Sequence, residues 1–126
     1  MKWVRLFLAI AALILIGGAG VHAAAFPKAN AAIRASGLPD FYARSARALW
    51  LADSTTLAWI GVTCAFLAVR PHSATPLVIA LTVLPVAATA GLIYWFLGSF
   101  PPAHLLAIAT AFVMAAAIVR SRLSGE

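Results

Sequence analysis

The chain has 126 residues, of which 64% are hydrophobic and 10% charged, and its formal net charge is +6. A soluble domain of this length needs more polar surface to cover its core. Most basic residues lie near the ends of apolar blocks or in the first loop, which argues against nucleic-acid binding and favours contact with lipid phosphates. Cys64 is the only cysteine, which excludes an intrachain disulfide and thiol–disulfide chemistry that needs a pair.

Four apolar blocks divide the sequence, at residues 6–26, 48–69, 76–97 and 101–119. At about 1.5 Å per residue, each block is long enough as a helix to cross the hydrocarbon core of a bilayer, roughly 30 Å. We expect one all-α integral membrane domain over residues 1–126, a bundle of four antiparallel transmembrane helices. The short connections "RPHSAT" and "GSFPP" indicate that successive helices are neighbours.

The first block has features of both a signal peptide and a retained helix. Lys2 and Arg5 precede an apolar run, and Val21-His22-Ala23 fits a small-residue cleavage pattern. The run continues without interruption to Phe26, which is spanning length and favours a retained helix. With basic residues weighed mainly in the short loops, both termini are predicted to be cytoplasmic in a bacterial inner membrane.

Residues 27–47 form the first, outer loop and contain signals for a short amphipathic helix. Pro27 suits a first helical turn and Gly37 suits a position just after a helix end. Lys28 and Arg34 would then lie among lipid headgroups. The next helix is expected to begin near Pro39, with Asp40 and Arg44 as an i,i+4 ion pair. Aromatic residues at this level are expected to form an interfacial belt, namely Phe41, Tyr42, Trp50, Tyr94, Trp95 and Phe100.

Small residues recur along the last block at four-residue spacing, at Ala103, Ala107, Ala111 and Ala115. In lipid, small residues let helices approach closely. We expect this stripe to pack inside the bundle. The alternative is that Ala and Gly stripes form the face of a homo-oligomer.

A carboxylate interrupts the second apolar block. Asp53 lies six residues, or about 9 Å, inside Arg47. Each of the other blocks also places a polar side chain near its outer end, at His22, Tyr94 and His104, and Thr56 shares the Asp53 face. An ionised carboxylate facing lipid is costly, so Asp53 is expected to point inward and to find a partner. The candidate partners are His22, Tyr94, His104 and Arg47.

Two interpretations of these residues stay open. In one, His22, Asp53, Thr56, Tyr94 and His104 form a buried hydrogen-bonded cluster that holds the bundle together. In the other, they line a pocket, open at the outer face, for a small ligand, a proton or a quinone-like headgroup. No HxxxH or HxxE spacing is present, so no metal site is predicted. A haem held by His22 and His104 is conceivable, since both are expected at one depth.

The stretch "GGAGVHAAAFPKANAAIRASGLPDFYARSARALWLADSTTLAWIGVTCAFLAVRP" resembles the front half of DoxX-like membrane proteins. Shared features are the Gly-containing first helix with a polar end, the amphipathic loop with a "GLP" break, and an acid early in helix two. The family commonly has Lys and Glu where this chain has His22 and Asp53, which retains a base–acid pair. The resemblance extends over roughly residues 6–97. It implies a four-helix protein, and some members are membrane partners of oxidoreductase or sulfur-metabolising complexes.

The leading functional hypothesis is a non-catalytic accessory or ligand-binding module. No nucleophile, base and orienting group occur in a recognisable set, so the isolated chain is not predicted to be an enzyme. One alternative is the membrane subunit of a respiratory or sulfur-metabolism oxidoreductase that uses the pocket for a quinone. A further alternative is a proton-coupled small transporter.

Overall fold

The structure, a computed structural model, describes residues 1–124 of the chain. Over that range it contains five helices and no strand. The helices are α1 (Lys2–Ala24), α2 (Phe26–Ala35), α3 (Asp40–Val69), α4 (Pro76–Leu97) and α5 (Pro101–Ser124). All except α2 are long and apolar enough to cross a membrane. The expectation of an all-helical fold with four long apolar helices is confirmed, as is a short helix in the first loop.

Local sequence signals explain where the helices begin and end. Pro39 has an extended backbone and precedes α3, and Asp40 forms the expected i,i+4 ion pair with Arg44. After α2, Gly37 adopts a φ of 68°, a conformation that costs glycine little. Before α4, the Thr75 hydroxyl accepts a hydrogen bond from the Val78 N–H at 3.2 Å, which caps that helix. These signals account for the observed starts of α3 and α4 and the end of α2. Helix α1 begins before its predicted apolar block 6–26, and α5 continues beyond the predicted block 101–119.

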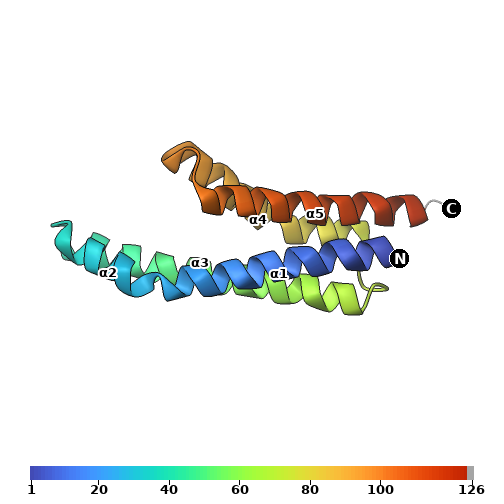
Figure 1. Cartoon of the computed structure of the whole chain (residues 1–126), viewed down its shortest axis with the longest axis horizontal. Coiled ribbons are helices and arrows are strands. Elements are labelled where there is room, and N and C mark those ends of the chain that lie inside the picture. The colour runs from blue at the N-terminus through green and yellow to red at the C-terminus, as the bar shows by residue number, and fades with distance from the viewer. Residues whose placement is uncertain (125–126) are drawn as a thin grey trace.

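The packing order of the long helices is α3, α1, α5, α4 (Figure 1). The blue helix α1 lies along α3 on one side and packs against α5 on another, while α4 packs against α5. Consecutive helices α4 and α5 are neighbours as predicted. Helices α3 and α4 are not: they touch little and diverge away from the turn that joins them. The reason is that α1 and α5 pair with each other, and each of the two outer helices packs mainly on one member of that pair.

Both described chain ends lie at the same end of the bundle, together with the α3–α4 turn (Figure 1). The Arg120 Nε–H donates to the Ala74 carbonyl oxygen at 3.1 Å, which ties this turn to α5. We call the opposite end, which carries the α1–α3 connection and the α4–α5 turn, the distal end. The shared location of the termini agrees with the predicted even number of crossings.

One cluster of buried apolar side chains joins all four long helices. Its largest fully buried members include Leu8, Leu15, Ile79, Val86 and Val113. The prediction that Ala103, Ala107, Ala111 and Ala115 all face inward is wrong in part. Ala103 is fully buried, but Ala111 is exposed and the other two are half-buried. Residues spaced by four drift about 40° around a helix at each step, so the buried face of α5 instead follows a mixed spacing of three and four.

Gly61 explains how closely α1 and α3 approach. A Cβ atom at this position would lie 2.7 Å from Ile16 Cγ1 and 3.1 Å from the Ile16 backbone nitrogen. The contact is possible only without a side chain at Gly61. This close approach lies two turns from the polar residues described next, and it holds the two helices in register.

Candidate functional site

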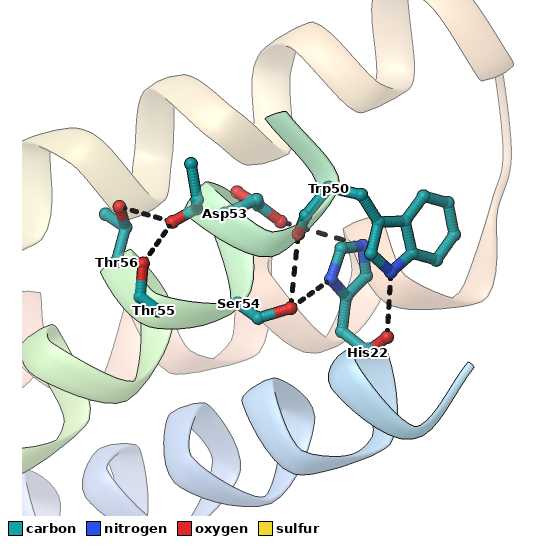
Figure 2. Close-up of polar contacts among 7 residues, drawn as sticks. His22, Trp50, Asp53, Ser54, Thr55 and Thr56 are labelled. Carbon is teal, nitrogen blue, oxygen red and sulfur yellow. Dashed lines mark hydrogen bonds and ion pairs between the residues drawn. The ribbon is translucent and has the colours of Figure 1, made fainter. Parts of the chain in front are cut away.

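His22, in the last turn of α1, is held by two residues of α3 (Figure 2). Its Nδ1 atom lies 2.8 Å from Ser54 Oγ. The Trp50 Nε1–H donates to the His22 carbonyl oxygen at 2.9 Å. The imidazole and indole rings are stacked, with centroids 4.3 Å apart and an interplanar angle of 10°. Helix α3 therefore contacts the backbone carbonyl, the ring face and one ring nitrogen of His22.

Trp50 and Ser54 were missed as site residues by the sequence analysis. Trp50 was expected in the interfacial aromatic belt, but it is half-buried against His22. Ser54 is 6% exposed and is the buried polar residue of the described core. Their spacing could have indicated a shared role, because Trp50 and Ser54 are one turn apart on α3 and therefore share a face. The sequence does not reveal that this face meets α1 at the level of His22.

The contacts of Ser54 favour one tautomer of the His22 ring. The Ser54 hydroxyl lies 2.8 Å from His22 Nδ1 and 3.2 Å from the Trp50 carbonyl oxygen. A hydroxyl has one proton to donate, and a carbonyl oxygen can only accept. Both bonds form together when Ser54 donates to the carbonyl and His22 Nδ1–H donates to Ser54. In the neutral ring, Nε2 is then an unprotonated acceptor.

Asp53 faces that second nitrogen. Its Oδ2 atom lies 3.8 Å from His22 Nε2, and the side chains of His22 and Asp53 are 27% and 36% exposed. The predicted pairing of these two residues is thus formed, although Asp53 lies at the edge of the α1–α3 contact rather than deep inside the bundle. Arg47, another candidate partner, instead donates its Nε–H to the Ala43 carbonyl oxygen at 3.1 Å.

Thr56 does not take part in this cluster, contrary to expectation. Its hydroxyl donates to the Ala52 carbonyl oxygen at 2.8 Å, and the neighbouring Thr55 hydroxyl donates to the same oxygen at 2.9 Å (Figure 2). Threonines in helices often satisfy their hydroxyl in this way. Thr56 therefore lies on the same face of α3 as Asp53, but its hydroxyl bonds its own helix and not Asp53 or His22.

Tyr94 and His104 form a second, separate pair at the distal end of α4 and α5. The Tyr94 hydroxyl lies 2.7 Å from His104 Nδ1, and Ser99 Oγ lies 3.1 Å from His104 Nε2. The two rings meet edge-on, with centroids 5.4 Å apart. Both ring nitrogens of His104 are thus engaged by side chains of its own hairpin, which fastens the α4–α5 turn.

The expectation that His22 and His104 lie at one depth is wrong. The Phe7 and Phe112 rings, 6.0 Å apart, set the register of the antiparallel helices α1 and α5. Counting back from Phe112 places His104 level with Leu15, so His22 lies seven residues, or about 10 Å, farther along α1. The predicted residues therefore form two pairs rather than one pocket, and the conceivable two-histidine haem arrangement is not formed. Among the described residues, no group of three or more His, Cys, Asp or Glu side chains could hold a metal ion.

Comparison of the chain with protein-family models, with curated proteins and with solved structures finds no match. The class of this protein is therefore defined by its own fold: residues 1–124 form five helices, four of them long and apolar enough to cross a membrane.

Proposed function

We propose that this chain is a multi-pass protein of the bacterial inner membrane, that it serves as a binding or accessory module, and that His22 and Asp53 are its binding group. The spans support the membrane assignment, because the long helices expose many large apolar side chains, such as Leu13 at 75% and Trp59 at 73%, which water would not favour. Both termini are assigned to the cytoplasm. In support, five basic residues gather at the end of the bundle that carries the termini, namely Lys2, Arg5, Arg70, Arg120 and Arg122.

One observation carries the functional part of the proposal. His22 Nε2 and Asp53 Oδ2 face each other at 3.8 Å while Nδ1 is engaged by Ser54. In the tautomer that Ser54 favours, Nε2 and Oδ2 are both acceptors, and they repel each other unless a proton or a donor group lies between them. A cluster that served only to join the helices would be complete with His22, Trp50 and Ser54. The half-exposed Asp53 is the member that the helix contact does not require.

The DoxX-like layout of residues 17–71 supports the accessory role. It places the base–acid pair in the same part of the fold, at the end of the first helix and early in the second long helix. Under this proposal, the amphipathic α2 and the start of α3 form the outer segment, and the distal end faces away from the cytoplasm.

Native mass spectrometry of the gently solubilised protein tests the proposal. We expect a bound species on the wild-type chain that is lost from Asp53→Asn. Asp40→Asn is a matched control, because it makes the same chemical change on the same helix at an exposed ion pair. If Asp53→Asn retains the species, or if its only effect is a shifted melting temperature, the binding proposal is wrong and the cluster serves to join α1 and α3.

A further inference from the structure

The surface of α3 that carries Asp53 continues into a groove between α3 and α4. Asp53, Thr56, Ile60 and Thr63 follow one another at three- and four-residue spacing and share one face. The groove has a volume of about 300 Å³ and is lined by Trp59, Ile60 and Thr63 of α3 and by Leu81, Thr82 and Pro85 of α4. Asp53 is seven residues, or about 10 Å, from Ile60. A carboxylate and an apolar groove thus lie in line along one side of α3.

The groove exists because the two helices diverge. From the α3–α4 turn toward the distal end, α4 follows α5 and α3 follows α1 (Figure 1), and α3 and α4 make few contacts with each other. Pro85 has no N–H, so the Leu81 carbonyl oxygen lacks its usual helical donor at this point. The hydroxyls of Thr63 and Thr82 are already bonded to carbonyl oxygens of their own helices. The groove is therefore mainly apolar. The Leu81 carbonyl oxygen is an acceptor without its helical donor, and the hydroxyl protons of Thr63 and Thr82 are already used.

The polar head group of a ligand that fits this site must complement two acceptor atoms at the distal end, His22 Nε2 and Asp53 Oδ2. An ammonium group has three N–H donors and a positive charge, so one such group can donate to both His22 Nε2 and Asp53 Oδ2. A carboxylate or phosphate head would add a third acceptor and a like charge. The two acceptor atoms of the pair thus favour a cationic donor as the head group.

The apolar groove favours an amphiphile over a small soluble cation, because only an amphiphile has an apolar chain to place there. The segment outside Asp53 carries Lys28, Arg34, Arg44 and Arg47 against the single acid Asp40. This excess of positive charge slows the association of a cation that approaches from water. A ligand dissolved in the bilayer reaches the space between α3 and α4 from the side without passing these residues.

We propose that the α3–α4 groove and the His22–Asp53 pair together bind an amphiphile with a protonated amine head and an apolar chain. The head lies between Nε2 and Oδ2, and the chain follows the face of Thr56 and Ile60 into the groove beside Trp59. This inference rests on the proposed function, since it uses the same acid–base pair and adds the class of ligand.

The test uses the full chain in lipid nanodiscs and dodecylamine with a bromine at the chain end, which quenches tryptophan fluorescence on contact. The matching brominated dodecanol measures quenching by partition into the bilayer alone. We expect saturable quenching by the amine above the alcohol baseline in the wild type and in Asp40→Asn. The amine affinity should fall at least tenfold in Asp53→Asn and recover in Asp53→Glu. In Trp59→Phe, the excess quenching should fall sharply while the bound amine remains visible by native mass spectrometry.

Three outcomes overturn the inference: equal quenching by amine and alcohol, amine binding that persists in Asp53→Asn, or a two-chain complex that excludes the amine. The last would mean that a second copy occupies the groove. The proposed function can be judged separately. If the native wild-type chain carries an Asp53-dependent species and dodecylamine does not bind, the amine assignment fails and the proposed function stands. If neither species depends on Asp53, both fail.

Discussion

The indole of Trp50 lies flat on the imidazole of His22 at 4.3 Å and donates its N–H to the carbonyl oxygen of the same histidine. One α3 side chain therefore holds both the ring and the backbone of the last turn of α1. The last turn of a helix leaves carbonyl oxygens without a donor in the next helical turn. The Ala25 N–H donates to the Val21 carbonyl oxygen, and the indole N–H takes the same role at the His22 carbonyl oxygen. The orientation of His22 toward Asp53 depends on this contact.

We expect Trp50→Phe to lower the free energy of unfolding by about 1 kcal/mol, because a phenyl ring retains the stacking but not the hydrogen bond. Trp50→Ala should cost more again, because it loses about 0.5–1.5 kcal/mol of ring stacking together with the apolar area that the indole buries. Unfolding by a denaturing detergent in mild micelles measures both. Trp95→Phe is the control, since Trp95 is 82% exposed. Equal effects of the Trp50 and Trp95 substitutions would contradict the assigned role.

Ser54→Ala removes the acceptor for His22 Nδ1–H and leaves a half-buried N–H without its partner. We expect a loss of about 1–3 kcal/mol in unfolding free energy. Nitrogen NMR of the His22 ring should also show a larger share of the tautomer protonated at Nε2, since only Ser54 favours the other form. Thr55→Ala is the matched control, because the Thr55 hydroxyl bonds only a carbonyl oxygen of its own helix in the described contacts. An unchanged tautomer in Ser54→Ala would refute the proton assignment.

Gly61→Ala forces a methyl group to within 2.7 Å of Ile16 Cγ1 and against the α1 backbone. We expect a destabilisation of about 1–3 kcal/mol, because the backbone of α1 cannot yield as a flexible side chain can. Gly91→Ala on α4 meets nothing within 4 Å and should be neutral or stabilise the helix by up to about 1 kcal/mol. The same denaturation assay compares the two. A Gly61→Ala protein as stable as Gly91→Ala would mean that α1 and α3 pack less closely than described.

Tyr94→Phe removes the hydrogen bond to His104 at an exposed position. We expect a loss of no more than about 1 kcal/mol and no change in the Asp53-dependent bound species. Combined with Ser54→Ala, the two losses should add within about 0.5 kcal/mol, because the pairs share no partner. A coupling energy above that value would show that His22 and His104 belong to one network after all.

The helices themselves were predictable because their signals are local. Pro39, Gly37 and Pro76 mark ends through backbone conformation, which each residue sets on its own. The depth of His104 relative to His22 was not predictable, because it depends on the register of α1 against α5. That register is set by side-chain packing such as Phe7 on Phe112, which no local pattern reveals.

Composition and periodicity alone determined that this chain is helical, that four of its helices are long and apolar enough to span a bilayer, and that His22 and Asp53 merit attention. Only the tertiary structure decided that α1 lies between α3 and α5, that Trp50 and Ser54 hold His22, and that Tyr94 and His104 stand apart. The physical reason is that an apolar sequence favours a membrane helix but does not determine which other helix it packs against, since many apolar faces could pair. Close fits at a few positions, Gly61 above all, select one arrangement.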